Sequence, residues 1–272
     1  MQLTEVSAKT GYVWFRQGIW LFRRNPLGFL TIFFTYLIAM WAASLIPFVG
    51  AVLPLALIPG IAVGFMTACR DTVAGKMIFP TVLADGFRSY GAAGAMRLIE
   101  LGGIYVAAIA LVFAGSALAD GGVLFKVMMG TQSVSPTAMA AGPLMAAGLV
   151  ALVCYVPVAM LFWFAPVLAT WHDVPPVKAM FFSLVTCWRN RGAFIVYGAL
   201  WFATAIVVST GLSLLMDAIG AGDYAFTILF PASLTLTTML YCSFYATYRG
   251  CYGMQEPNAN GTGTDPRETP GA

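Results

Sequence analysis

Residues 25 to 69 read NPLGFLTIFFTYLIAMWAASLIPFVGAVLPLALIPGIAVGFMTAC and contain no Asp, Glu, Lys or Arg. A membrane helix needs about 20 apolar residues to cross a hydrocarbon core roughly 30 Å thick. The stretch is long enough for two such helices, and the sequence PFVG at 47–50 supplies a turn between them. We therefore predict a helical hairpin with spans at about 27–46 and 51–69.

Four more apolar stretches follow, with spans at about 101–119, 143–171, 192–216 and 224–248. The chain is 60% hydrophobic and only 9% charged, whereas a soluble domain typically carries about 25% charged residues. Lipid is the solvent that removes the need for a charged surface. We predict an all-α membrane protein with six transmembrane helices. Residues 1–252 form a single integral membrane domain in this prediction, and residues 253–272 form a disordered cytoplasmic tail.

The positions of the basic residues predict the orientation. All of the 14 Lys and Arg residues except Lys126 fall in segments that six spans place on the same side. Cytoplasmic loops carry an excess of Lys and Arg, so both termini are predicted to be cytoplasmic in a bacterial inner membrane. The apolar run after Arg24 is too long for the core of a cleaved signal peptide, and we expect it to remain as the first span.

The segments before the first, third and fifth spans end alike, with an aromatic residue, an Arg, polar residues and then a Pro or Gly. These endings are FRRNP at 22–26, FRSYG at 87–91 and WRNRG at 188–192. Internal prolines occur only in the second, fourth and sixth spans: Pro54, Pro59, Pro157, Pro166 and Pro231. We infer three repeats of an interfacial amphipathic helix followed by a helical hairpin. Chance similarity among apolar helices is the alternative.

Two of the predicted interfacial helices, at 9–24 and 176–190, carry basic residues on one face. In the first, Lys9, Arg16 and Arg23 are seven residues apart, with Trp14 and Leu21 nearly opposite. Such a helix suits the headgroup layer, with its aromatic side toward the acyl chains. We expect these helices to act as anchors, with recognition of lipids, anionic ones included, as the alternative. The predicted headgroup contacts are Lys9, Arg16, Arg23, Arg24, Lys178 and Arg189.

A polar cluster is predicted at the cytoplasmic helix ends, formed by Arg70, Asp71, His172, Asp173 and Arg249. An enzyme could use His172, the only histidine, as an acid or base oriented by Asp173. Neighbours along a helix do not face each other, so a solvated interfacial histidine is the favoured interpretation. The hydrolase, nucleotide-binding and zinc motifs are missing, and the five cysteines have no spacing typical of a metal site or disulfide framework. We predict no catalytic residue, metal or cofactor.

Two features inside the predicted spans have alternative interpretations. Glu100 is the only acid near the hydrocarbon, where acids are costly and usually functional. Arg97, three residues earlier, can pair with it on the same helix face, and an interfacial position for both is favoured. Gly60 and Gly64 form a GxxxG pattern beside Pro59. Close helix packing is the expected role of these glycines, and a binding site at the proline break is the alternative.

Several short sequences carry a resemblance to a known family. They are VWFRQG at 13–18, FRRNP at 22–26, PG at 59–60 with GFM at 64–66, and KAMFFS at 178–183. Together they resemble an uncharacterised family of proteobacterial inner-membrane proteins over nearly the whole chain. More loosely, the repeated unit is similar to the membrane domain that accompanies some glycerophosphodiester phosphodiesterases. The first resemblance implies a membrane location without catalytic residues, and the second implies no reaction because the phosphodiesterase domain is missing.

These observations favour a non-enzymatic inner-membrane scaffold that contacts lipids or an unidentified protein partner, and they give no sign of nucleic-acid binding. The alternative is a passive channel or small-solute transporter built around the proline-containing second, fourth and sixth helices. An ion-coupled carrier generally needs several buried carboxylates, and here Glu100 is the single candidate.

Overall fold

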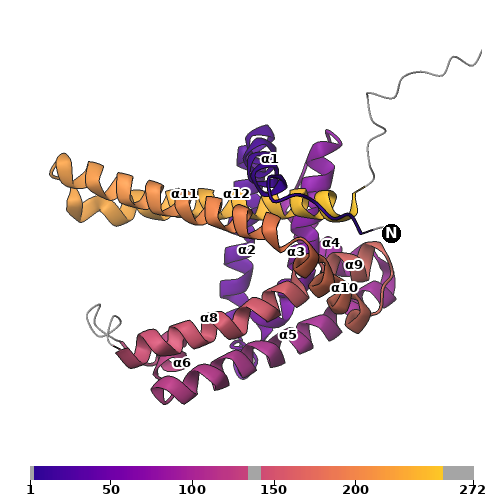
Figure 1. Cartoon of the computed structure of the whole chain (residues 1–272), viewed down its shortest axis with the longest axis horizontal. Coiled ribbons are helices and arrows are strands. Elements are labelled where there is room, and N and C mark those ends of the chain that lie inside the picture. The colour runs from indigo at the N-terminus through magenta and orange to yellow at the C-terminus, as the bar shows by residue number, and fades with distance from the viewer. Residues whose placement is uncertain (1–2, 134–141, 254–272) are drawn as a thin grey trace, which may run out of the picture.

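The computed structural model describes residues 3–133 and 142–253, and this part of the chain is helical without strands (Figure 1). Within these residues, six helical segments are long and apolar enough to cross a membrane. The protein is therefore an all-α membrane protein, as predicted. The tail at 254–272 lies outside the described residues, so its predicted disorder stays a prediction.

The spans form three helical hairpins, each with a shorter helix before it. The hairpins are α2 (Pro26–Ser44) with α3 (Leu53–Val73), α5 (Gly91–Asp120) with α8 (Gly142–Phe162), and α11 (Arg191–Ala218) with α12 (Ala225–Tyr252). The other elements are α1 (Thr10–Arg24), η1 (Pro80–Ala84), α4 (Asp85–Arg88), α6 (Val123–Met128), α9 (Ala165–Trp171), α10 (Pro176–Arg189) and η2 (Gly222–Tyr224). The helix before the second hairpin is only the short η1–α4 segment, unlike α1 and α10. The threefold repeat thus stays a prediction.

Local sequence explains where the first span begins. Asn25 ends α1 and accepts a hydrogen bond on its side-chain oxygen from the backbone N–H of Gly28 at 3.0 Å. Pro26 follows at the first position of α2, where its missing N–H costs nothing. The same short sequence therefore stops one helix and starts the next. This allows the chain to change direction sharply between α1 and α2.

Two helices differ from the predicted spans. Helix α5 begins at Gly91, well before the predicted start at 101, and so includes Arg97 and Glu100. Hydropathy identifies the part of a helix that suits lipid, and polar residues can extend the helix beyond that part. The fourth span is interrupted, because Trp163 and Phe164 separate α8 from α9. The α9 helix starts with Ala165 and Pro166, consistent with the preference of proline for a first turn.

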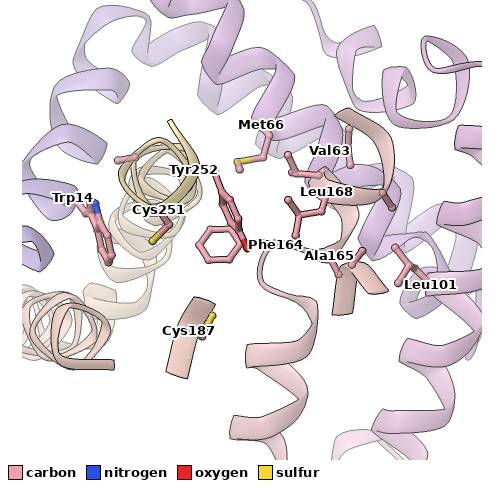
Figure 2. Close-up of a cluster of buried hydrophobic side chains, with 14 of the residues drawn as sticks. Trp14, Val63, Met66, Leu101, Phe164, Ala165, Leu168, Cys187, Cys251 and Tyr252 are labelled. Atoms are coloured by element: carbon pink, nitrogen blue, oxygen red, sulfur yellow. The ribbon is translucent and has the colours of Figure 1, made fainter. Parts of the chain in front are cut away.

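The packed core lies where the inner ends of the hairpins meet α1, α9 and α10. We call this the basic end, because it carries the basic segments, and we call the described hairpin loops at 45–52, 121–133 and 219–224 the distal loops. Figure 2 shows part of this core, where Trp14 of α1, Met66 of α3, Leu168 of α9 and Tyr252 of α12 surround Phe164 from the break between α8 and α9. The Phe164 and Tyr252 rings meet edge to face, with centroids 5.2 Å apart. Tertiary packing therefore concentrates at one end of the bundle.

The hairpins separate toward their distal loops. In Figure 1 the α5–α8 and α11–α12 hairpins extend away from the basic end and diverge, while α2 runs in a third direction. Their outer surfaces expose large apolar side chains such as Leu118, Val153, Phe202 and Phe226. Exposed apolar area of this extent is unfavourable in water and marks a membrane-facing surface.

Helix α1 is held by protein rather than by lipid. Its buried face consists of Gly11, Trp14, Gly18, Leu21 and Phe22, and it packs against α11 and α12. Trp14 is 1% exposed. The interpretation that Trp14 points toward acyl chains is therefore wrong. An apolar helix face can be covered equally well by lipid or by neighbouring helices, and its sequence periodicity does not distinguish between them.

The GxxxG pattern serves close packing, as expected, but its partner is not another span. A side chain at Gly60 would collide with the ring of Phe87, and a Cβ at Gly64 would lie 2.6 Å from the Cα of Leu83. Both neighbours belong to the η1–α4 segment. The two glycines thus allow this segment to press against α3 at the basic end.

Candidate functional site

The predicted polar cluster is divided by the structure into separate contacts. The Arg70 guanidinium lies over the ring of Trp171, 4.7 Å from its centroid. The Asp71 carboxylate lies 3.9 Å from Arg70 and 4.0 Å from Lys76. These side chains are partly or largely exposed, and ion pairs of this kind contribute little stability. The cation–π contact is the more specific interaction, since it joins the end of α3 to the end of α9.

His172 and Asp173 interact with different partners. The Nε2 atom of His172 is 2.7 Å from the Tyr248 hydroxyl, which comes from α12. Asp173 accepts a hydrogen bond at 2.7 Å from Nη1 of Arg97, which comes from α5. The two adjacent side chains therefore do not pair with each other in this arrangement. Among the described residues, no group of three His, Cys, Asp or Glu side chains could hold a metal ion.

The Arg97 contact corrects the expected pairing with Glu100. Nη1 of Arg97 also donates to the backbone carbonyl of Ala169 at 3.0 Å, near the end of α9. The Arg97 side chain is 23% exposed, whereas Glu100 is exposed on the surface of α5. A helix end has carbonyls without intrahelical partners, and a cation there is favourable. Arg97 is thus directed toward α9 by two acceptors, and this leaves Glu100 outside the network.

Partial burial affects the protonation of His172. Desolvation by the surrounding protein lowers the pKa of His172 below its usual value of about 6.5. A cavity of about 460 Å³ lies beside the ring, bordered by His172, Thr186 and Tyr252 together with apolar side chains. At neutral pH the imidazole is therefore neutral, and it can either donate to the Tyr248 oxygen or accept from its hydroxyl.

A second feature of the basic end is a groove between α1 and α12, which we call the basic groove. It has a volume of about 470 Å³. Arg16 of α1 and Arg249 of α12 both line it, although the sequence separates them widely. Its other lining residues are Tyr12, Val13, Gln17, Trp20, Leu21, Val73, Tyr245 and Ala246. The Tyr245 side chain is within electrostatic reach of Arg249, Arg70 and Asp71, so the groove and the polar cluster are neighbours.

The predicted headgroup residues are distributed over the basic end. Lys9, Arg16, Arg23, Arg24 and Lys178 are exposed. The Arg24 guanidinium stacks over the Trp20 ring at 4.3 Å, and Arg189 forms an ion pair of 2.5 Å with Glu5. The structure brings Arg16 together with Arg249, but it places Lys178 and Arg189 on a different helix. Their contact with lipid stays a prediction.

Sequence reasoning missed the aromatic partners of these charges. Trp20, Trp171 and Tyr248 each contact a cation or the histidine of the site. Aromatic residues near basic residues at the ends of spans are a general feature of the membrane interface. This enrichment could have indicated such contacts from the sequence, although it does not predict which aromatic side chain contacts which charged side chain.

The comparison with known proteins agrees with the fold in indicating a membrane protein. No protein family model matches it, and no solved structure matches it. A probable inner membrane protein of Burkholderia thailandensis is 65% identical over 261 residues, which cover 95% of this chain and 97% of that relative. An identity of this extent over nearly the full length of both proteins establishes common descent. The chain therefore belongs to the family of this probable inner membrane protein.

Proposed function

We propose that this protein is a non-enzymatic inner-membrane scaffold that acts through contacts of its basic end with lipid headgroups. The orientation of α1 is the observation that carries the proposal. Gly11, Trp14 and Gly18 are buried against α11 and α12, which directs Lys9 and Arg23 away from the protein. A helix fixed in this way presents a row of cations where the bundle meets the headgroup layer.

The polar groups within the spans support a scaffold over a transporter. Hydroxyl groups along the spans donate to carbonyls of their own helix, as Thr31, Thr204 and Thr238 do at 2.7 to 2.8 Å. Groups used in this way offer little to a passing solute. The cavity that Pro166 lines is about 20 Å³, enough for about one water molecule. Pro59 is buried, and Pro231 lies on an exposed part of α12.

The partners of His172 and Asp173 support a non-enzymatic role. A histidine acting as acid or base is usually oriented by a carboxylate or carbonyl. Here Asp173 faces Arg97 instead. The looser resemblance to the membrane domain found with some glycerophosphodiester phosphodiesterases stays a prediction, and no step of the proposed function depends on it.

The test is association of lipid vesicles with the purified full chain, which is held in surface-tethered nanodiscs of phosphatidylcholine. We expect binding to vesicles of phosphatidylcholine with phosphatidylglycerol to exceed binding to phosphatidylcholine alone, and to weaken as salt is added. The Lys9→Gln/Arg23→Gln variant should lose part of that preference. Arg88→Gln/Arg191→Gln removes the same charge elsewhere at the basic end and should lose less. Equal binding to both kinds of vesicle would refute the proposal, and solute flux through protein-containing liposomes would support the channel alternative.

A further inference from the structure

We propose that the basic groove is a binding site for one anionic phospholipid, with its phosphate between Arg16 and Arg249 and its glycerol and upper acyl carbons along the apolar wall. This inference rests on the proposed function and deepens it, since it assigns headgroup recognition to one cavity. The groove has a volume of about 470 Å³, within the range typical of small-ligand pockets.

The charge of the groove selects an anion. Arg16 and Arg249 are its charged lining residues, and no carboxylate lines it. Arg249 also interacts within the protein, so Arg16 is the more available of the two. The Arg16 guanidinium lies 5.8 Å from the ring centroid of Tyr12, which orients it beside the cavity. Guanidinium groups bind phosphate oxygens in bidentate fashion, and two of them at one cavity suit a phosphodiester.

The remaining walls select a ligand that is also apolar. Val13, Leu21, Val73 and Ala246 border the groove, and the exposed surface within it is mostly apolar. Tyr12 and Trp20 are 50% and 48% exposed at its rim. An inorganic phosphate would use the arginines and leave these walls in contact with water. A phospholipid would cover both kinds of surface, and aromatic side chains at such a rim are typical of the headgroup level.

The position of the groove agrees with this occupant. Its walls come from α1, from the last turns of α12 and from the end of α3, all at the basic end of the bundle. The buried face of α1 is held by Gly18 against Ser243 of α12, so the backbone positions that carry the two arginines are fixed relative to each other before any ligand arrives. A site formed in advance loses less entropy on binding than one that must be assembled.

The experiment compares lipid affinity of variants in nanodiscs of phosphatidylcholine with added phosphatidylglycerol, using the full chain. We expect Arg16→Gln/Arg249→Gln to weaken phosphatidylglycerol binding by about tenfold or more. Arg88→Gln/Arg191→Gln, with the same loss of charge outside the groove, should change it by less than about threefold. Arg16→Lys retains the charge without the planar fork and should give an intermediate loss.

The outcomes separate the site from the general proposal. Equal losses of phosphatidylglycerol affinity in the groove variant and in the control would overturn the proposed binding site. The general proposal that the basic end contacts anionic headgroups would still stand. No preference of the unaltered protein for phosphatidylglycerol would overturn both. Competition by inorganic phosphate as effective as that by a soluble short-chain phosphatidylglycerol would show a phosphate site and overturn the lipid assignment. Because Arg249 has contacts within the protein, Arg16→Gln alone, at an exposed position, keeps the test valid if the double variant does not fold.

Discussion

The Ser183 hydroxyl of α10 accepts a hydrogen bond from the backbone N–H of Phe164 at 2.9 Å, at the break between α8 and α9. The same hydroxyl donates to the backbone carbonyl of Met160 at 2.7 Å. In an uninterrupted helix the Phe164 N–H would bond to that carbonyl directly. The Ser183 hydroxyl therefore replaces one hydrogen bond of the helix and satisfies both its donor, the Phe164 N–H, and its acceptor, the Met160 carbonyl.

This relationship predicts that Ser183→Ala is strongly destabilising. Ser183 is fully buried, so its removal leaves a donor and an acceptor without partners in an apolar environment. We expect a loss of about 2 kcal/mol in the free energy of unfolding. The measurement is the thermal midpoint of the protein in detergent. Ser209→Ala is the matched control, because the Ser209 hydroxyl is exposed and bonds only to its own helix. A similar shift in both variants would contradict the bridging role.

The break in the fourth span shows which part of the fold could be predicted from the sequence and which could not. The apolar run from 143 to 171 predicted a membrane helix, and Pro166 within it marked a place where a helix can be interrupted. Pro157, Pro59 and Pro231 lie inside uninterrupted helices. The difference depends on Ser183, which lies nineteen residues beyond Phe164. Only tertiary structure brings the replacement partner to the break, so the sequence alone does not show which of these prolines interrupts its helix.

The close packing of α1 against α12 leads to a second prediction. A Cβ at Gly18 would collide with the Cβ of Ser243 and would lie 2.8 Å from its Cα. Gly18→Val therefore forces α1 away from α12, and we expect a loss of more than about 2 kcal/mol in stability. Gly198→Val on α11 is the control, since nothing lies within 4 Å of its Cβ position. The readouts are thermal stability and proteolysis of residues 10–24. Comparable stability of both variants would show that the close approach is unimportant.

The network around Arg97 gives a third prediction. Arg97→Gln removes the ion pair with Asp173 and the hydrogen bond to the Ala169 carbonyl. We expect it to cost about 1 to 2 kcal/mol. Asp173→Asn should cost well under 1 kcal/mol, because the Asp173 side chain is 82% exposed. Glu100→Gln should be nearly neutral. A loss of stability in Glu100→Gln as large as that in Arg97→Gln would restore the pairing first expected from the sequence.

The candidate site was predictable in composition but not in its contacts. Sequence position placed Arg70, His172 and Asp173 near helix ends on one side, because loops between spans must lie there. It paired Arg97 with Glu100, since residues three apart share a helix face. The partner in the structure, Asp173, lies 76 residues further along the chain, in the loop after α9. Several acceptors of similar chemistry compete for one guanidinium, and the packing of α5 against α9 decides among them.

A fourth prediction concerns pH. Burial lowers the pKa of His172 in the folded state. The unfolded chain then binds more protons than the folded chain between the two pKa values. The contribution of neutral His172 to the free energy of unfolding is therefore complete above the pKa of the unfolded chain, about 6.5. It decreases as the pH drops from there toward the lower pKa of the folded state. His172→Asn should remove that part of the pH dependence of the thermal midpoint. Because His172 is the only histidine, an unchanged profile in the variant would exclude it as the cause.

The orientation of the bundle is the last prediction, and it follows from charge alone. Lys and Arg segments are retained on the cytoplasmic side during insertion, so Ser89 at the basic end should face the cytoplasm and Asp223 in a distal loop should face outside. Both positions are exposed. A membrane-impermeant maleimide should label Asp223→Cys in intact spheroplasts and Ser89→Cys only after permeabilisation. Cys154→Ser provides the background, since the other four cysteines are buried. The reverse labelling pattern would invert the topology, and with it the placement of the basic groove on the cytoplasmic leaflet.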